Sequence, residues 1–160
     1  MFLCFDDQRR LLLHRRTDAC RDEVGKWDCG GGEIEFGEDP VQTLRREVRE
    51  EYGAGVQWQR LLGVRNVVRD DQQSPSHWIA IVFEARVDGG EVRLNEPEKM
   101  ADLAWFDPDD LPTPLHSQLK KHLALRQSPE AEDPRPKTRR SRLREFLDLF
   151  GRPSIRRSPA

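Results

Sequence analysis

The segment GGGEIEFGEDPVQTLRREVREEYG, residues 30–53, constrains the fold more than any other part of the chain. Its leading glycines break regular structure, and Asp39 followed by Pro40 supplies a favourable N-cap and first residue for a helix. Gly53 is a favourable residue for ending that helix. Apolar side chains recur between these signals at helical intervals, at Val41, Leu44, Val48 and Tyr52. The pattern predicts an amphipathic helix over residues 40–52 that packs this apolar face on a core.

Three acidic residues of this helix, Glu47, Glu50 and Glu51, share a different arc of the helical wheel. Like charges three or four residues apart weaken a helix by roughly 0.2–0.5 kcal/mol per pair, so a compensating charge is expected. One explanation is a set of surface salt bridges, since Arg46 and Glu50 are spaced as an i,i+4 pair. The other is a divalent cation such as Mg²⁺ or Mn²⁺, which prefers oxygen ligands. The preceding glycines favour the cation, because they allow close backbone approach and offer carbonyl ligands.

The rest of the pattern predicts strands, a hairpin and one further helix. Apolar and alternating runs predict strands over residues 2–5, 10–16, 56–68, 77–87, 91–94 and 103–106. The long strand over 56–68 is expected to bend at Gly63, and residues 88–90 are expected to turn a hairpin into 91–94. A second helix is expected to begin at Thr113-Pro114. Its predicted buried residues are Leu115, Leu119, Leu123 and Leu125.

Composition and charge limit the classes of protein that the chain can represent. With 36% hydrophobic and 35% charged residues, the 160-residue chain can bury one core beneath a heavily charged surface. Three cysteines without a CxxC pair favour reduced thiols and a cytoplasmic location, and no apolar run is long enough for a membrane span. The formal net charge of −2 combines an acidic body, 1–126, with a basic, Pro-rich extension, 127–160. This distribution argues against a dedicated nucleic-acid binder.

The extension 127–160 has its own expected features. Residues 139–150 could form a short amphipathic helix, and the remainder is typical of a flexible appendage. Its basic side chains could alternatively attract RNA, a membrane surface or a second subunit, so a homodimer is one open hypothesis.

Nine constrained positions spread over 23 residues carry a family resemblance. They follow the order Gly-x5-Glu-x7-Arg-Glu-U-x-Glu-Glu-x-Gly-U, in which U is a bulky aliphatic residue. This pattern resembles the signature of the Nudix hydrolases, and Ala54, which is small for the last position, is its one soft departure. The resemblance implies the Nudix fold, an α+β architecture in which a central mixed β-sheet lies within an α/β/α sandwich, over 1–126. The matching residues are Gly32, Glu38, Arg46, Glu47, Val48, Glu50, Glu51, Gly53 and Ala54.

The same resemblance implies roles for the residues of the signature. Glu47 and Glu50 are expected to be catalytic, and Mg²⁺, with Mn²⁺ as an alternative, is expected to be the cofactor. The expected metal ligands are Gly31, through its carbonyl, and Glu47, Glu50 and Glu51. Residues with an expected structural role are Gly32, Glu38, Arg46 and Gly53, and Glu38 and Arg46 are expected to pair and hold the loop against the helix. The general base can also come from a later loop in this family, so Glu96 and Glu98 are candidates for an extra base or ligand, with a solvated acidic loop as the alternative.

The implied reaction is attack of water on a pyrophosphate of a nucleotide or nucleoside diphosphate derivative. Arg16 could contact phosphate, with an ordinary surface arginine as the alternative. His77 and Trp78 open a strand that could border the pocket, although a tryptophan at the start of a strand more often belongs to the core. The resemblance favours a nucleoside triphosphate substrate, with nucleotide-pool sanitising as one role. ADP-ribose or a nucleotide sugar is the second choice, and a non-catalytic nucleotide-binding domain is the third.

Overall fold

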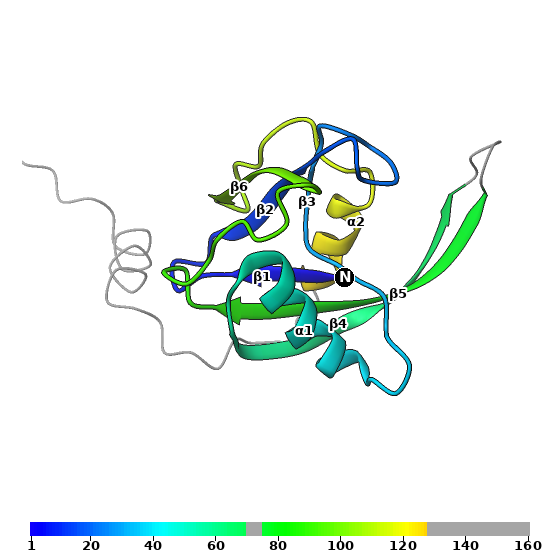
Figure 1. Ribbon diagram of the computed structural model, residues 1–160, viewed down its shortest axis with the longest axis horizontal. Coiled ribbons are helices and arrows are strands. Elements are labelled where there is room, and N and C mark those ends of the chain that lie inside the picture. The colour runs from blue at the N-terminus through cyan, green and yellow to red at the C-terminus, as the bar shows by residue number, and fades with distance from the viewer. Residues whose placement is uncertain (70–74, 128–160) are drawn as a thin grey trace, which may run out of the picture. The chain divides into compact units, whose positions relative to one another are not determined.

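The computed structural model describes residues 1–69 and 75–127, so the predicted helix over 139–150 lies outside the described part of the chain. Six strands form one sheet (Figure 1). They are β1 (Phe2–Phe5), β2 (Leu11–Arg16), β3 (Trp27–Asp28), β4 (Val56–Arg69), β5 (Ser76–Val87) and β6 (Met100–Phe106). The helices are α1 (Pro40–Tyr52) and α2 (Leu119–Ala124), followed by a short 3-10 turn, η1 (Leu125–Gln127).

The sheet is mixed because one of its central pairings is parallel. Its strand order is β3-β2-β1-β5-β4, and β6 pairs with β2. Strands β1 and β5 run parallel, whereas the other neighbours, including the predicted β1–β2 pair at Phe5 and Leu11, are antiparallel. All four residues of β1 are buried, as expected for a short apolar strand covered on both faces.

Two clusters of buried side chains cover the two faces of the sheet. On one face, α1 packs Leu44, Val48 and Tyr52 against residues that include Phe2 and Leu12. On the other face, Leu119 of α2 joins a cluster with members from β1 and β2. The members of that second cluster are Leu3, Phe5, Leu11, Leu13, Cys29 and Leu119. This layering confirms the predicted α+β sandwich built around a mixed sheet.

Helix α1 begins and ends where its capping residues predict. The Asp39 side chain accepts hydrogen bonds from the backbone N–H groups of Val41 (2.8 Å) and Gln42 (2.9 Å). The Gln42 side chain in turn accepts from the Asp39 N–H at 2.8 Å, which completes the capping box. Gly53 ends the helix in the left-handed conformation, with φ of 65°. Local sequence therefore determines the position of the acidic helix.

Strands β4 and β5 form a long hairpin that extends beyond the rest of the sheet (Figure 1). The pairing register shifts between Leu61 and Gly63, which confirms the predicted interruption of this strand. Side chains alternate beyond that point, so one face of the hairpin carries Trp78 and the other carries His77. The hairpin therefore presents two chemically different faces.

The predicted strand over 91–94 does not form. Instead, the backbone N–H of Arg93 donates to the Tyr52 carbonyl (2.9 Å), and that of Asn95 donates to the Glu51 carbonyl (3.2 Å). The segment thus satisfies the carbonyls at the end of α1, which have no partner within the helix. Tertiary hydrogen bonding replaces the hairpin that the turn residues predicted.

The second helix begins later than predicted, at Leu119 instead of Thr113-Pro114. The Trp27 N–H donates to the Pro114 carbonyl (2.9 Å), and the His116 N–H donates to the Trp27 carbonyl (2.8 Å). The chain before α2 therefore runs extended along β3, which keeps Leu115 out of the helix but still places it against the core. Within residues 1–69 and 75–127, no helix is long and apolar enough to cross a membrane.

Candidate active site

Arg46 of α1 holds the glycine-rich loop against the helix. Its Nε donates to Glu38 Oε1 (2.8 Å) and its Nη2 donates to Glu38 Oε2 (3.0 Å), so the guanidinium grips the carboxylate with two bonds. Nη2 also donates to the Glu33 carbonyl at 3.1 Å. The Arg46 guanidinium holds the pKa of Glu38 down at about 2, against the opposing effect of desolvation. The predicted contact between Glu38 and Arg46 is therefore present.

The same arginine offsets part of the repulsion between the helix glutamates. Its Nη1 donates to Glu47 Oε1 at 2.8 Å and to Glu50 Oε2 at 2.9 Å, so two carboxylates meet at one nitrogen. The side chain of Glu50 is half exposed, whereas that of Glu47 is mostly covered. The salt bridges expected from the first explanation are therefore present at Glu47 and Glu50. They do not exclude a cation, because both explanations place positive charge among the carboxylates.

Glu51 is the carboxylate of α1 with the weakest hydrogen bonding among the described residues. It is buried, its Oε1 accepts a long bond from the Gly31 N–H (3.4 Å), and its Oε2 has no partner among the described residues. Burial raises the pKa of Glu51 well above its usual range, and the nearby Glu47 and Glu96 add to this effect. An unpartnered buried oxygen is costly, and a cation or a proton there would relieve the cost. This donor set fits a hard divalent ion.

Gly32 lies in close contact with Glu47. A Cβ at this position would overlap the Glu47 carboxylate, so a larger residue would displace that flexible side-chain end. Burial raises the pKa of Glu47, while hydrogen bonding to Arg46 opposes the increase. The loop glycine and the helix glutamate are therefore in direct contact, although they are 15 positions apart in the sequence.

The structure separates the two later glutamates proposed as an extra base or ligand. Glu96 contributes negative potential at both Glu47 and Glu51, and its Oε2 is buried without a partner among the described residues. Its Oε1 accepts a bond from Lys99 Nζ at 2.9 Å. Glu98 is exposed to solvent. Glu96 therefore joins the carboxylate cluster, whereas Glu98 fits the solvated-loop alternative.

Part of this cluster borders a pocket of about 850 Å³, a volume suited to a nucleotide, whereas Glu50 and Glu96 are not among the residues that line it. One part of its wall carries Gly31, Gly32, Glu47 and Glu51. The wall also includes residues that the sequence did not single out, because they come from separate loops and follow no common spacing. These residues are Arg21, Asp22, Asp28, Lys99, His116 and Gln118.

The three predicted substrate contacts have different positions. Trp78 lines the pocket, and the Arg21 guanidinium lies 5.1 Å from the centre of its ring. Trp78 is 37% exposed, so the alternative that places it in the core is wrong. His77 lies on the opposite face of the hairpin, where its ring pairs with Asn66 (3.2 Å), away from the pocket wall.

Arg16 also lines the pocket, but its charge already has partners in the protein. Its Nη2 donates to Asp22 Oδ1 at 2.8 Å and its Nη1 lies 3.4 Å from Asp28 Oδ2. Burial raises the pKa of Asp28 to about 7, and Arg16 opposes that effect. Arg16 therefore lines the pocket with its charge paired to Asp22 and Asp28.

Comparison with known proteins agrees with the fold and the signature. The family model described as the NUDIX domain matches residues 1–126. The human 8-oxo-dGDP phosphatase NUDT18 is 35% identical over 115 residues, which cover 71% of this chain and 32% of the human protein. The nucleoside triphosphatase NudI of Escherichia coli is 32% identical over 107 residues, which cover 62% of this chain and 74% of that protein. The chain thus spans about a third of the length of its human relative.

A crystal structure of a MutT NUDIX hydrolase from Burkholderia pseudomallei has the same fold. It aligns with a TM-score of 0.65 and 32% identity, and the match covers 78% of this chain and 95% of that chain. The match of the family model over most of the chain, the complete signature and this shared fold lead to one conclusion: the chain belongs to the NUDIX family.

Proposed function

We propose that this protein hydrolyses the pyrophosphate linkage of a nucleotide with the help of Mg²⁺, for which Mn²⁺ could substitute. The observation that carries the proposal is the group of carboxylates beside the pocket, in which Glu51 Oε2 and Glu96 Oε2 are buried without a partner among the described residues. Glu47, Glu50, Glu51 and the Gly31 carbonyl would hold the ion. When bound, it would neutralise phosphate oxygens and lower the pKa of water.

The chain's own residues would perform the remaining steps. Glu47 has a raised pKa and lies at the pocket wall, so it is suited to accept a proton from water, with Glu50 and Glu96 as alternative acceptors. Arg46 and Glu38 would keep the loop and the helix in register while charge changes nearby. Trp78, on the face of the β4–β5 hairpin opposite His77, would stack on a nucleobase and exclude water from one side of that base.

We place nucleoside triphosphates first among substrates, in a nucleotide-pool sanitising role. The similarity to a bacterial nucleoside triphosphatase and to a human 8-oxo-dGDP phosphatase supports a nucleoside di- or triphosphate. ADP-ribose and nucleotide sugars remain the second choice. A purely binding domain is the third, and the complete set of signature acids argues against it. The three unpaired cysteines, two of them buried, support a cytoplasmic location.

A panel of substrates tests the proposal. Purified protein is incubated with Mg²⁺ and nucleoside triphosphates, oxidised guanine nucleotides or ADP-ribose, and the release of phosphate and nucleotide is measured. Glu50→Gln should reduce turnover strongly, whereas Glu91→Gln, an exposed carboxylate outside the pocket, should leave it unchanged. Equal turnover by wild type and Glu50→Gln would refute the metal assignment, and binding without turnover on any substrate would favour the binding domain.

A further inference from the structure

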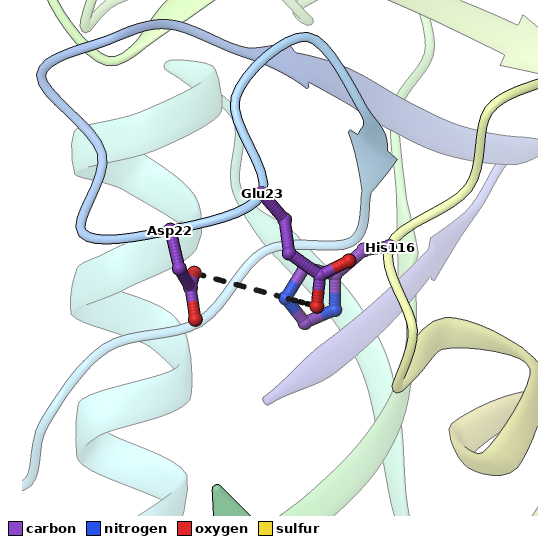
Figure 2. Close-up of side chains that lie close together, drawn as sticks. All are labelled: Asp22, Glu23 and His116. Atoms are coloured by element: carbon purple, nitrogen blue, oxygen red, sulfur yellow. Dashed lines mark ion pairs between the residues drawn. The ribbon is translucent and has the colours of Figure 1, made fainter. Parts of the chain in front are cut away.

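A second group of metal-ligating side chains lies at the pocket, and two of its three members, Asp22 and His116, line the wall. Figure 2 shows Asp22 and Glu23, from the loop between β2 and β3, facing His116, from the segment before α2. One ligand atom from each residue lies within 4.8 Å of the others. His116 Nε2 is 3.3 Å from Glu23 Oε1 and 3.9 Å from Asp22 Oδ1. Two ligands that are each about 2 Å from one tetrahedral ion lie about 3.3 Å apart, so the histidine and Glu23 already have suitable spacing.

The imidazole provides an independent sign that a ligand is missing. The His116 side chain is 2% exposed, and its Nε2 is buried without a hydrogen-bond partner among the described residues. Burial lowers the pKa of His116 to about 4, against the attraction of Glu23, so the ring is neutral at physiological pH. A buried, neutral imidazole nitrogen this close to two carboxylates is suited to bind a metal ion. Without an ion it is an N–H group that makes no hydrogen bond of good geometry.

The other ring nitrogen has a partner suited to support metal binding. His116 Nδ1 lies 3.5 Å from Asp28 Oδ2 and accepts a hydrogen bond from the Gln118 N–H at 3.2 Å. If a metal ion bound to Nε2, the ring proton would lie on Nδ1. Nδ1 could then donate a hydrogen bond to Asp28, and the bond that it now accepts from the Gln118 N–H would be lost. A carboxylate behind a metal-bound histidine is a recurrent arrangement that fixes the ring and makes it more basic.

Nearby cations decide which ion could bind. Arg16 and Arg69 pair with Asp22, and Lys26 pairs with Glu23 at 2.9 Å. Burial opposes ionisation of Glu23, but bonds from Ser117 and Lys26 outweigh it and lower its pKa to about 2. These pairs orient both carboxylates. The two oxygens nearest His116 Nε2, Asp22 Oδ1 and Glu23 Oε1, each accept one hydrogen bond among the described residues and so retain a second lone pair. The positive charge of the nearby cations opposes any divalent ion, so the site requires an ion with strong affinity for imidazole, which Mg²⁺ lacks.

We propose that Asp22, Glu23 and His116 bind a late first-row divalent ion of the Zn²⁺ class, at a site separate from the proposed Mg²⁺ site. The ion would cross-link the loop over 17–26 to the segment before α2, and would thereby fix one wall of the substrate pocket. This site goes beyond the proposed hydrolysis and does not depend on it.

Calorimetric titration of the untagged full chain with Zn²⁺, in excess Mg²⁺, tests the site. All proteins in this experiment, including the parent called wild type, carry Cys20→Ser, which removes the partly exposed thiol. We expect one equivalent of Zn²⁺ to bind, and Co²⁺ in its place to give visible absorption typical of a tetrahedral site. Asp22→Asn and Glu23→Gln should each weaken binding at least about tenfold, and Asp28→Asn by about 10–100-fold. Asp18→Asn, an exposed carboxylate of the same loop, is the matched control.

Two further measurements separate this site from folding defects and from the glutamates of α1. Thermal unfolding of each variant without metal checks the fold, and a Zn²⁺-dependent rise in Tm should occur in wild type but not in Asp22→Asn. Glu50→Gln should retain the Zn²⁺ equivalent. The proposal is overturned if wild type binds no Zn²⁺ in excess Mg²⁺, if Asp18→Asn and Asp22→Asn bind equally, or if Glu50→Gln abolishes binding.

Discussion

Replacing Glu51 by glutamine should make the metal-free protein more stable while removing its response to Mg²⁺. In the structure the carboxylate is buried, and its Oε2 lacks a partner among the described residues. A glutamine amide has nearly the same shape, retains the acceptor for Gly31, and brings N–H donors toward the neighbouring Glu47 and Glu96 carboxylates. The substitution therefore exchanges an unsatisfied buried acceptor for a donor without creating a cavity.

The expected magnitude follows from the cost of that oxygen. A buried polar atom without a partner costs about 1–3 kcal/mol, of which the amide should recover about 1–2 kcal/mol. For a domain of this size that corresponds to a rise in Tm of about 3–8 °C. The pKa of Glu51 is raised above 4.5, so folding stability falls as pH rises from 4.5 through the raised pKa. The advantage of Glu51→Gln should therefore grow as pH increases across that window.

Mg²⁺ should reverse the order of stability. At about 100 times its Kd, the ion stabilises wild type by about 2.7 kcal/mol through mass action, whereas the variant has lost a ligand and gains little. The assay is thermal unfolding by circular dichroism, with chelator and with Mg²⁺, at several pH values. Glu98→Gln, which removes one exposed negative charge, should change stability by less than about 0.5 kcal/mol in both conditions.

The result that would refute this reasoning is a lower Tm for Glu51→Gln than for wild type in chelator. It would mean that the carboxylate has partners that outweigh its burial. An equal Mg²⁺-dependent increase in both proteins would instead remove Glu51 from the metal site.

Gly32→Ala should displace the Glu47 carboxylate and lower Mg²⁺-dependent turnover more than about tenfold, as measured by steady-state kinetics against Mg²⁺ concentration. The Tm in chelator should change little, because the displaced group is a flexible side-chain end. The Glu38–Arg46 pair should contribute stability that is fully present above pH 4.5 and is lost as pH falls through about 2, so Glu38→Gln should flatten the acid limb of urea unfolding. Trp78→Ala should raise KM at least about threefold and leave kcat nearly unchanged, because it removes stacking remote from the phosphates.

Matched variants make these outcomes decisive. Gly55→Ala introduces a Cβ with ordinary contacts, so a similar loss of activity there would contradict the steric argument at Gly32. Glu98→Gln should leave the acid limb of urea unfolding unchanged. If it flattened that limb as much as Glu38→Gln does, the net charge of the protein, and not the Glu38–Arg46 pair, would determine the loss of stability in acid. His77→Ala changes the opposite face of the hairpin, and an equal rise in KM would remove the stacking role of Trp78.

Local signals predicted α1, because capping and helical periodicity act within a few residues, and the family resemblance predicted its contact with the loop through Glu38 and Arg46. The N-cap, Gly53 and the Arg46–Glu38 pair are where the sequence placed them. The segment over 91–94 and the start of α2 were predicted incorrectly for one shared reason. Their backbone groups bond to distant partners, the carbonyls at the end of α1 and the edge of β3, and these partners override turn and helix preferences.

By itself the sequence determined the family signature, the acidic helix and the alternating strands, since each depends on spacing along a single element. Only the tertiary structure decided that Glu51 is buried with an orphan oxygen, that Glu96 and not Glu98 joins it, and that Trp78 faces the pocket while His77 faces away. Burial and the distance between loops depend on how the elements pack, and no spacing within one element encodes them. The same reason hid Asp22, Glu23 and His116, which meet only because the chain before α2 lies along β3.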